Sequence, residues 1–419
     1  MTEVIIPYKP RDLQRSLHKE MRRFNVLVCH RRFGKTVFSI NELIKKAAMC
    51  PLKDGRFGYV APYLLQAKDV AWTYLKRFTA PIPGVTYNES ELRVDLPNGA
   101  RIRLYGADNA ERLRGLYLDG VVMDEYGQMH PSVWPEIIRP MLTDREGFAI
   151  FIGTPMGRNH FCDMYEHATQ DGDWLARRYR SSETNIINDV ELHNARKSMS
   201  VDQYNREFEC SFDAAIPGAY YAALLQQADV DNRITRVPYE PRVPVVTSWD
   251  LGMDDMTAIW FIQHVGMERH VIDYYENNNE EPPHYAMIVK SKNWAYDCHY
   301  LPHDADNRGV LSKRTYVDQL NSLEIGRIQV GVRGNPLDRI AAVRSILPSC
   351  WFDRDKTKKG LDGLRAYQTE FDEDKQTFKD HPLHNWASHP ADAFGEYATG
   401  HRAKPKTKSP QDYPQRRLA

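Results

Sequence analysis

The sequence lacks the features of several protein classes. Its six cysteines, at positions 29, 50, 162, 210, 298 and 350, include no Cys-x-x-Cys pair, which argues against a zinc ribbon or a disulfide framework and suits a reducing cytosol. No apolar run is long enough to span a membrane, and the first residues, MTEVIIPYKPRDLQ, contain no stretch typical of a signal peptide. We therefore expect a chain that needs no membrane.

An excess of charge of one sign is also absent, because 56 basic residues balance 56 acidic ones. If the partner is a nucleic acid, the attraction must come from local patches rather than from overall charge. With 42% hydrophobic and 27% charged residues, the composition is that of an ordinary globular protein. The length of 419 residues exceeds one typical core and predicts two domains.

The first half of the chain alternates short apolar runs with helical patterns. Strands covered on both faces are predicted from the apolar runs at 26–29, 57–61, 120–123 and 148–152. Helices are predicted at 35–49 and 64–78, and Asn98-Gly99, between 91–96 and 101–105, is a strong hairpin signal. The alternation predicts an α/β fold with a mostly parallel sheet and helices on both sides.

The pattern changes after about residue 212. Prolines and a glycine between 217 and 244 are typical of a domain boundary. We predict a first domain over 1–215, a linker over 216–243, a second domain over 244–400 and a basic, disordered tail over 401–419.

The second domain is predicted to begin with three antiparallel strands, at 245–249, 256–265 and 270–275. Helices at 285–294, 316–323 and 337–347 then alternate with strands at 300–301 and 328–332. This is the order of an RNase H-like domain with a mixed sheet.

The motif Cys29-His-Arg-Arg-Phe-Gly-Lys-Thr36 ends like a nucleotide-binding P-loop. In such a loop, backbone N–H groups wrap phosphate oxygens, a lysine reaches the β- and γ-phosphates, and a hydroxyl holds Mg²⁺. Gly34, Lys35 and Thr36 are therefore candidate ATP-binding residues. Gly-Lys-Thr alone also occurs by chance.

Two departures distinguish this loop from most P-loops. Cys29 stands where the first glycine is expected, and Arg31 and Arg32 add positive charge inside the loop. Both arginines are candidates for contact with the nucleotide phosphates.

Three further segments support nucleotide hydrolysis. An apolar strand ends in Asp124, which can hold Mg²⁺ through water, and Glu125 beside it can orient or deprotonate the attacking water. Thr154 follows another buried strand and can sense the γ-phosphate, while Gln14 can read the adenine edge. Each segment has a plainer interpretation, as a solvated strand end, a turn or a helix surface. Their order along the chain favours ATP binding and hydrolysis.

Arg112 and Arg114 precede the strand that ends in Asp124. An arginine there can reach the γ-phosphate of a neighbouring subunit, and such fingers contribute about 10³–10⁵ in rate. A surface salt bridge is the alternative for either residue.

A second group of candidates consists of carboxylates. Asp250 and Asp304 each follow an apolar strand, and Asp392 lies at the start of a late helix. In an RNase H-like fold these positions converge, and carboxylates that close raise one another's pKa unless cations compensate. Two Mg²⁺ or Mn²⁺ ions would relieve the repulsion and clamp a scissile phosphodiester. The alternative is turn and helix-capping chemistry, which also favours aspartate.

Other residues nearby leave the ligand set open. Asp254, Asp255 and Asp306 lie close to these aspartates in the sequence, and either Asp255 or Asp306 is a possible further ligand. His303 and His389 flank two of the aspartates and can orient ligands, although a surface histidine is the more frequent case.

Taken together, the arginine-bearing P-loop, the Asp-Glu strand, Gly153-Thr-Pro and the downstream carboxylates resemble the large terminase subunit of tailed bacteriophages. The resemblance covers about residues 1–400. It implies a packaging motor that uses ATP and Mg²⁺ to move double-stranded DNA into a procapsid. It also implies an endonuclease with two Mg²⁺ or Mn²⁺ ions that cuts concatemeric DNA at the start and end of packaging.

The resemblance also assigns roles to individual residues. It implies that Arg31 is the loop arginine, that Lys35 and Thr36 bind phosphate and Mg²⁺, and that Arg114 rather than Arg112 is the finger. The remaining implied roles are the second ATPase motif, the coupling residue and the nuclease metal ligands, which fall on Asp124, Glu125, Thr154, Asp250, Asp304 and Asp392.

The partners implied are double-stranded DNA, a portal protein with its procapsid, a small terminase subunit and further copies in a ring, in the cytoplasm of a bacterial host. Two alternatives stay open. A helicase–nuclease of DNA repair would carry a Gln-x-x-Gly-Arg-x-x-Arg-like segment and a second motor domain, and the sequence contains neither. A nucleotide-gated scaffold with a degenerate nuclease would have no need to keep Glu125 and the three aspartates.

Overall fold

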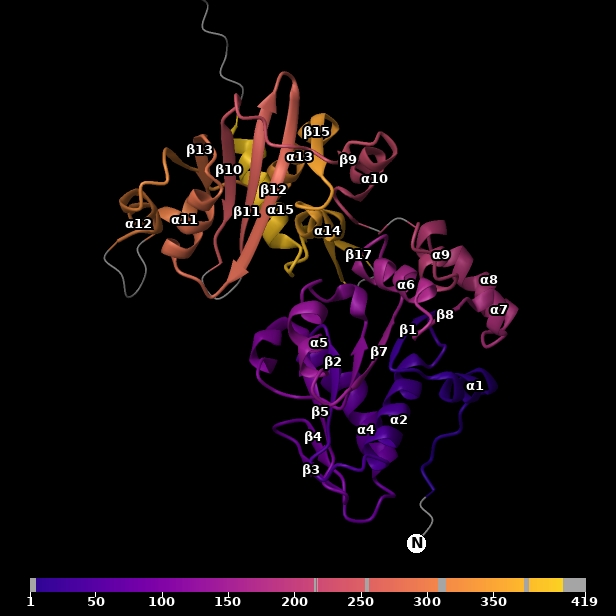
Figure 1. Ribbon diagram of the computed structural model, residues 1–419. Coiled ribbons are helices and arrows are strands. Elements are labelled where there is room, and N and C mark those ends of the chain that lie inside the picture. The colour runs from indigo at the N-terminus through magenta and orange to yellow at the C-terminus, as the bar shows by residue number, and fades with distance from the viewer. Residues whose placement is uncertain are drawn as a thin grey trace, which may run out of the picture. The chain divides into compact units, whose positions relative to one another are not determined.

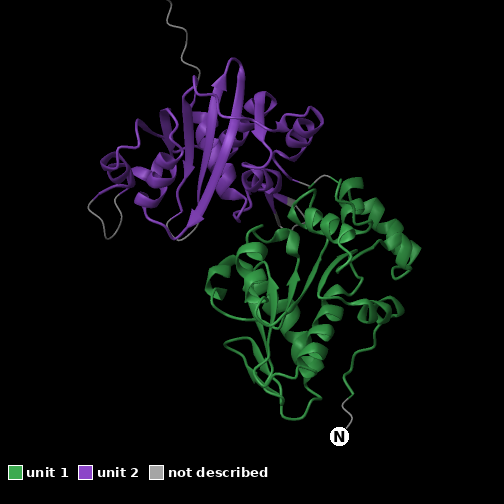
Figure 2. Ribbon diagram, viewed as in Figure 1, with its two compact units in different colours: residues 1–217 green, residues 218–419 purple. Residues whose placement is uncertain are grey.

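The computed structural model describes residues 5–214, 216, 218–252, 256–307, 314–372 and 377–401 (Figure 1). They form two compact units, residues 1–217 and 218–419, coloured separately in Figure 2. Asp254 and Asp255, and the predicted tail beyond His401, lie outside the described residues.

Unit 1 is built on an eight-stranded sheet in the order β3-β4-β5-β2-β6-β7-β1-β8. Its strands are β1 (Phe24–Cys29), β2 (Arg56–Ala61), β3 (Thr86–Asn88), β4 (Arg93–Asp95), β5 (Arg101–Gly106), β6 (Gly120–Asp124), β7 (Phe148–Gly153) and β8 (Trp174–Tyr179). The strands from β5 to β8 in this order run parallel, while β3 and β4 are antiparallel. The predicted mostly parallel sheet is confirmed, and the carboxyl ends of its parallel strands share one edge.

Helices and helical turns cover both faces of this sheet. They are α1 (Asp12–Glu20), α2 (Lys35–Ala48), α3 (Leu64–Ala67), η1 (Lys68–Trp72), α4 (Thr73–Thr79), η2 (Ala107–Leu113), η3 (Tyr126–Gln128), η4 (Val133–Ile138), α5 (Arg139–Met141), α6 (His160–Gln170), α7 (Ser181–Thr184), α8 (Asp189–Ser198) and α9 (Val201–Glu207). The helix predicted over 64–78 is interrupted by the π-helical turn η1. The wider i→i+5 turn is confined to five residues inside an otherwise α-helical segment, so the apolar pattern around it still predicted a helix.

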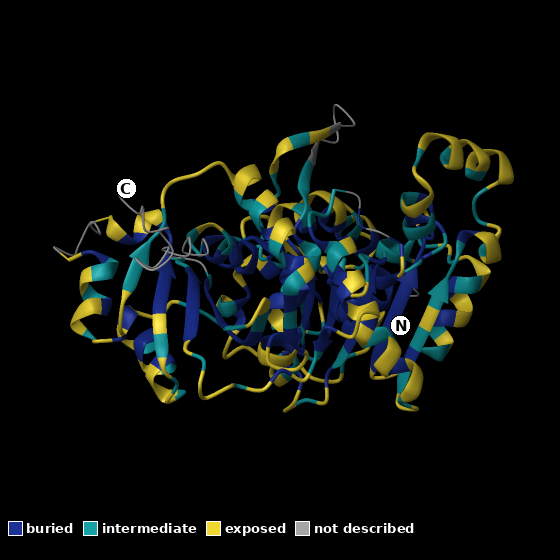
Figure 3. Cartoon of the chain, turned by 90° about the horizontal axis from the view of Figure 1, so that it is seen from above, coloured by how far each residue is buried: buried dark blue, intermediate teal, exposed yellow. Residues whose placement is uncertain are grey.

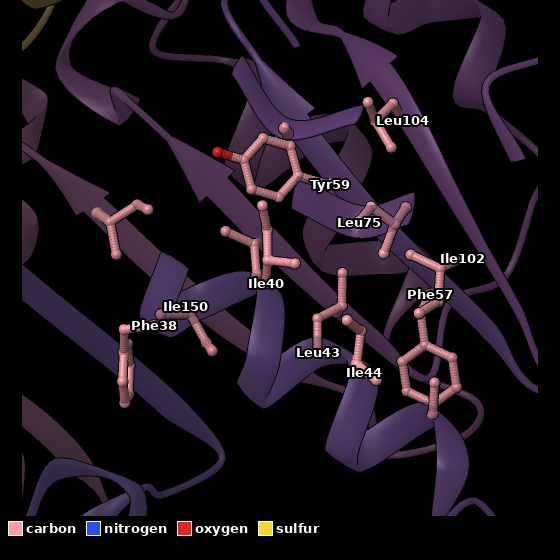
Figure 4. Close-up of a cluster of buried hydrophobic side chains, with 14 of the residues drawn as sticks. Phe38, Ile40, Leu43, Ile44, Phe57, Tyr59, Leu75, Ile102, Leu104 and Ile150 are labelled. Atoms are coloured by element: carbon pink, nitrogen blue, oxygen red, sulfur yellow. The ribbon is translucent and has the colours of Figure 1, made fainter. Parts of the chain in front are cut away.

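Alternation along the strands divides the core of unit 1 into two clusters. Leu27 and Ile150 pack with α2 and α4 on one face, while Val28 and Phe151 pack with α6 on the other. Figure 4 shows part of the first cluster, in which side chains of α2 such as Leu43 lie among those of the strands. Strands buried on both faces appear dark blue in Figure 3.

Unit 2 contains a seven-stranded mixed sheet in the order β14-β13-β10-β11-β12-β15-β9. Its strands are β9 (Ile234–Thr235), β10 (Val245–Asp250), β11 (Met256–Val265), β12 (Glu268–Asn278), β13 (Tyr296–Leu301), β14 (Ile328–Val330) and β15 (Cys350–Asp353). β10, β11 and β12 are antiparallel neighbours, and β13 and β14 run parallel to β10. The predicted antiparallel meander and RNase H-like strand order are confirmed.

Helices again cover both faces of the sheet in unit 2. They are α10 (Ala222–Val230), α11 (Pro282–Ser291), η5 (His303–Asp306), α12 (Tyr316–Ser322), α13 (Pro336–Ile346), η6 (Leu347–Ser349), α14 (Lys358–Ala366) and α15 (Ser388–Gly400). Trp260 belongs to the core cluster formed with α13, α14 and α15, whereas Ile259 belongs to the cluster formed with α11 and α12. A separate hairpin consists of β16 (Thr369–Asp372) and β17 (Thr377–Pro382).

The segment 216–243, predicted as a linker, carries α10 and β9 in the structure. Leu225 and Ile234 of these elements are buried in the core of unit 2, and β9 pairs with β15. The prolines behind the linker prediction at 238, 241 and 244 lie between β9 and β10. Within the described residues, no helix combines the length and the hydropathy that a membrane crossing requires.

Candidate nucleotide site and carboxylate cluster

The P-loop lies between β1 and α2, at the carboxyl edge of the sheet of unit 1. Arg32 and Gly34 both have a positive φ, of 68° and 89°. A Cβ at Gly34 would lie only 2.9 Å from Nε2 of Gln14. Glycine is therefore required at position 34 both by the backbone conformation and by this close approach.

Gln14 and its neighbour Arg11 hold the loop from α1. The Gln14 Nε2 donates to the carbonyl of Gly34 at 3.3 Å, and its Oε1 accepts from the backbone N–H of Arg11 at 3.0 Å. Arg11 Nη1 donates to the carbonyl of Phe33 at 2.8 Å. The Gln14 amide thus joins the loop backbone, through Nε2, to the start of α1, through Oε1, and its predicted role in reading adenine stays a prediction.

Two of the predicted residues, Lys35 and Thr154, contact the carboxylate of a third, Glu125. Lys35 Nζ lies 2.6 Å from Glu125 Oε1. Thr154 donates to the other oxygen, Oε2, from its backbone N–H at 3.3 Å and from its hydroxyl at 3.4 Å. Glu125 has a left-handed backbone, with φ 49° and ψ 46°, where the chain turns sharply out of β6. The structure therefore brings together the P-loop lysine, the Asp-Glu motif and the Gly-Thr-Pro segment.

Burial and charge oppose each other at this centre. Burial, followed by the negative charge of Glu125, raises the pKa of Asp124 to about 6. Burial alone would lower the pKa of Lys35, but Glu125 and Asp124 outweigh it, so the pKa of Lys35 is raised. A buried aspartate with a raised pKa is short of positive charge, which suits a residue that holds Mg²⁺.

Tyr59 of β2 is a site residue that the sequence analysis missed. Its side chain is buried, and its hydroxyl donates a short hydrogen bond to Asp124 Oδ2. Burial and then Asp124 raise the pKa of Tyr59, whereas a side-chain hydrogen bond with Thr36 opposes the shift. One hydroxyl therefore contacts both residues predicted to hold Mg²⁺. A tyrosine within an apolar strand is typical of core, so the sequence carried no signal for this role.

The loop arginines point to different surroundings. Arg31 pairs with Glu207 of α9 through Nε and Oε2 at 2.8 Å, and its N–H donates to the carbonyl of the same residue at 2.9 Å. Arg32 is exposed. His30 is buried, its backbone N–H donates to the carbonyl of Tyr179 in β8, and its Nε2 lies 2.8 Å from the Thr184 hydroxyl. The loop is thereby tied to the segment 181–207, which the motif analysis had not connected with it.

The two finger candidates lie at the end of η2, in the connection between β5 and β6. Arg114 pairs with Glu111 through two nitrogens, one of them 3.0 Å from Oε1. Its side chain is half exposed, and its Nη1 reaches the carbonyl of Glu136 at 3.4 Å. Arg112 is exposed. Both side chains are thus accessible to solvent.

The residues of unit 1 suit nucleotide hydrolysis. Thr36 and Asp124 would hold Mg²⁺, which when bound would neutralise charge on the phosphates. Loop N–H groups would orient phosphate oxygens, and Lys35 would add a positive charge beside them. Glu125 can accept a proton from water, and Thr154 donates two hydrogen bonds to that carboxylate.

In unit 2 the predicted aspartates gather at one end of the sheet. Asp250 ends β10, and Asp304 lies in η5 just after β13, which runs parallel to β10. Asp392 lies on α15, which packs against β10 and β11. Burial and then the charge of Asp250 raise the pKa of Asp392 to about 6, so these two carboxylates sense each other.

Two more residues of this cluster were missed by the sequence analysis. Glu396 lies one turn after Asp392 on α15 and is only 5% exposed. Burial, with contributions from Asp250, Asp392 and Asp304, raises its pKa to about 7 against the opposing charge of Arg339. Arg339 of α13 pairs with both Glu396 and Asp392. A glutamate inside a late helix looks like a surface residue in the sequence, and only the packing of α13 against α15 reveals its burial.

The flanking histidines differ from each other. His389 is buried, and its Nδ1 lies 3.0 Å from Asp250 Oδ2, so it orients that carboxylate. His303 is exposed, as is Asp306.

Divalent cations suit the chemistry of these oxygen donors, and the raised pKa values indicate a deficit of positive charge. Among the described residues, no three His, Cys, Asp or Glu side chains are grouped closely enough to hold a metal ion. A Mg²⁺ or Mn²⁺ ion held by Asp250, Asp304 and Asp392 together would therefore draw these carboxylates closer than they lie here, and it would supply the positive charge that stabilises phosphodiester cleavage.

The fold and the two sites define a chain that joins a P-loop unit to an RNase H-like unit with a carboxylate cluster. No family model matches the sequence. The large terminase subunit of Thermus phage G20c is 28% identical over 180 residues, which cover 38% of this chain and 37% of that protein. The chain therefore matches little more than a third of that relative's length.

A second relative matches more of the chain. The large terminase subunit of Escherichia phage T5 is 23% identical over 325 residues, covering 74% of this chain and 72% of that protein. The crystal structure of the HK97 bacteriophage large terminase covers 94% of this chain and 95% of its own, with 10% identity and a TM-score of 0.47. The chain is similar in sequence to large terminase subunits of phages, which confirms the resemblance seen in its motifs.

Proposed function

We propose that the chain is a DNA-packaging motor with a nuclease. Unit 1 hydrolyses ATP to move double-stranded DNA into a procapsid, and unit 2 cuts concatemeric DNA at the start and end of packaging. The observation that carries the proposal is the joining of two chemistries in one chain: the Lys35–Glu125–Thr154 contacts in unit 1 and the carboxylate cluster in unit 2. The T5 relative, named a large terminase subunit, supports the same combination.

In the ATPase cycle, the loop residues bind the nucleotide and Glu125 activates the attacking water. Gly34, Lys35 and Thr36 contact the phosphates and Mg²⁺ together with Asp124. Arg31 and Arg32 add charge near the phosphates, and Gln14 lies at the base of the loop. Because Lys35 is the counter-ion of Glu125, a phosphate that attracts Lys35 frees the carboxylate to act as a base.

Coupling and the trans finger complete the ATPase. Thr154, at the end of β7, donates to the Glu125 carboxylate, so a change at the nucleotide is transmitted to β7, which lies between β6 and β1 in the sheet. Arg114 is the finger that enters a neighbouring copy's site, with Arg112 as its less favoured alternative. Arg114 must break its ion pair with Glu111 before it can act as a finger. This favours a finger that acts only when copies of the chain assemble in a ring.

In the nuclease, Asp250, Asp304 and Asp392 would hold two Mg²⁺ or Mn²⁺ ions, which would supply the positive charge for phosphodiester cleavage. His389 keeps the Asp250 carboxylate in place. The partners are double-stranded DNA, a portal protein on a procapsid, a small terminase subunit and further copies of the chain, in a bacterial host. The alternative of a repair helicase–nuclease is not favoured, because the relatives are large terminase subunits.

The experiment is packaging in vitro with purified portal-bearing procapsids, small subunit, ATP and linear duplex DNA. We expect ATP-dependent protection of DNA from added nuclease. Glu125→Gln should abolish protection because the water loses its base, whereas Glu166→Gln, at a largely exposed carboxylate on α6, should not. Unwinding of a forked duplex without protection of linear DNA would instead support the helicase–nuclease.

A further inference from the structure

Arg339 occupies a central place among the acidic residues of unit 2. Its Nη1 lies 3.5 Å from Asp392 Oδ1 and 3.3 Å from Glu396 Oε1. Asp392 and Glu396 are four residues apart on α15, so both face α13 and the same nitrogen can bridge them. Charge-assisted contacts of arginine usually lie at about 2.7–2.9 Å. The two contacts here are longer, so the guanidinium is near both carboxylates without being locked to either.

The helix against which Arg339 packs is adapted to its side chain. Gly395 lies between the two carboxylates in sequence, and a Cβ there would come within 2.5 Å of Arg339 Cδ and 2.6 Å of its Cγ. Glycine inside a helix is less favourable than alanine, so its presence here has to be explained by packing. The missing side chain leaves the room in which the stem of Arg339 crosses α15. The position of the guanidinium is therefore built into both helices.

The guanidinium is also the cation that the cluster needs. Four carboxylates act on one another here, since Asp250, Asp304 and Asp392 all raise the pKa of Glu396. The positive charge of Arg339 opposes the rise in pKa of both Asp392 and Glu396. Its side chain is 19% exposed and that of Glu396 is 6% exposed, so water screens the pair weakly. One guanidinium nevertheless brings a single positive charge to four carboxylates.

We propose that Arg339 is a built-in competitor of the divalent cations in the nuclease site. It holds Asp392 and Glu396 together, and a Mg²⁺ or Mn²⁺ ion must displace the guanidinium before it can use these carboxylates. This inference rests on the proposed nuclease function and adds a regulation of that same site. Because the guanidinium must first leave, the apparent affinity for metal is reduced by the fraction of chains in which the carboxylates are free. Cutting is thereby restrained at low metal concentration.

The test measures Mn²⁺ binding to the full chain by electron paramagnetic resonance of the free ion, without DNA or nucleotide. Arg339→Met keeps the length of the stem and removes the charge, and we expect Mn²⁺ to bind about five- to tenfold more tightly. Arg344→Met is the matched control on the same helix, because the Arg344 guanidinium donates to the carbonyl of Tyr220 at 2.9 Å rather than to Asp392 or Glu396. The control should bind Mn²⁺ like the wild type.

A second variant, Gly395→Ala, tests the same proposal if Arg339→Met does not fold. Gly395→Ala keeps the arginine but pushes its stem off α15, and it should also tighten Mn²⁺ binding. Unchanged or weaker Mn²⁺ binding in a folded Arg339→Met or Gly395→Ala chain would overturn the proposal. A wild-type chain that neither binds Mn²⁺ nor cuts DNA at saturating Mn²⁺ would contradict the nuclease function itself. A wild-type chain that does both, beside variants with unchanged binding, would contradict the competition alone.

Discussion

Lys35 Nζ and Glu125 Oε1 lie 2.6 Å apart, and this ion pair joins α2 to the end of β6. The other oxygen of the same carboxylate accepts two hydrogen bonds from Thr154 at the end of β7. A ligand that attracts the Lys35 ammonium therefore changes both the charge balance of Glu125 and its hold on β7. The predicted binding, catalytic and coupling residues are thus connected by direct contacts.

Replacing Lys35 by Met should lower ATP hydrolysis by at least about 100-fold, because a positive charge beside the transferred phosphoryl group is lost from a buried site. Phosphate release from ATP is the measurement. Lys46→Met, at an exposed lysine on the same helix, is the control and should keep its activity. Metal-dependent nicking of plasmid DNA should survive in both variants. Loss of hydrolysis in the Lys46 variant as well would show that the effect is not specific to the loop.

The Tyr59 hydroxyl should strengthen the binding of the Mg²⁺ that ATP hydrolysis requires. Tyr59→Phe removes only the group that contacts Asp124 and Thr36, so the two Mg²⁺ residues lose their common anchor. We expect the Mg²⁺ concentration for half-maximal ATP hydrolysis to rise about tenfold, the equivalent of roughly 1.4 kcal/mol. The control is Tyr204→Phe, which deletes a buried hydroxyl that has no hydrogen-bond partner among the described residues. An identical Mg²⁺ dependence in the two variants would rule out this role.

The contrast between Lys35 and Tyr59 shows what can be read from the sequence. Lys35, Asp124 and Thr154 lie at ends of short apolar strands, and parallel strands bring such ends to one edge whatever the details of packing. The role of Tyr59 depends on which strand lies beside β6. In the sheet order that neighbour is β2, which is separated from β6 by three other strands in the chain. Apolar periodicity carries no information on this order.

The same distinction holds in unit 2. The order of strands followed from their spacing, and with it the convergence of Asp250 with Asp304. Arg339 and Glu396 depend on how α13 packs against α15, and both residues look like ordinary helix surface in the sequence. The segment 216–243 was interpreted as a linker because of its prolines, yet these lie beside α10 and β9 rather than within them.

Unit 2 should lose stability in mild acid through His299. Burial lowers the pKa of this histidine from the ordinary 6.5 to about 4. Its Nδ1 lies 2.6 Å from the Thr247 hydroxyl and its Nε2 2.8 Å from the carbonyl of Ile325, which suits a neutral ring that accepts at Nδ1 and donates at Nε2. Below pH 6.5 the unfolded chain takes up the proton first, so unfolding becomes more favourable as the pH falls towards 4.

This group alone should cost about 2 kcal/mol of unfolding free energy between pH 7.5 and pH 5. Urea unfolding followed by tryptophan fluorescence measures it. His299→Gln cannot gain a proton, so its unfolding free energy should change less over the same range, although it starts lower at pH 7.5. A variant with the same pH slope as the wild type would mean that other groups cause the loss.

Asp304→Asn should abolish metal-dependent cutting of plasmid DNA and leave ATP hydrolysis intact. The substitution keeps the size of the side chain but removes the negative charge that a divalent cation requires. Because Asp304 also raises the pKa of the buried Glu396, its loss should not destabilise the fold, and the melting temperature should stay the same or rise. The matched control is Asp297→Asn, at an exposed aspartate on β13, the strand that leads to Asp304. Cutting at the wild-type rate by Asp304→Asn would remove this residue from the nuclease site. Loss of ATP hydrolysis in the same variant would point to a general defect rather than to a missing metal ligand.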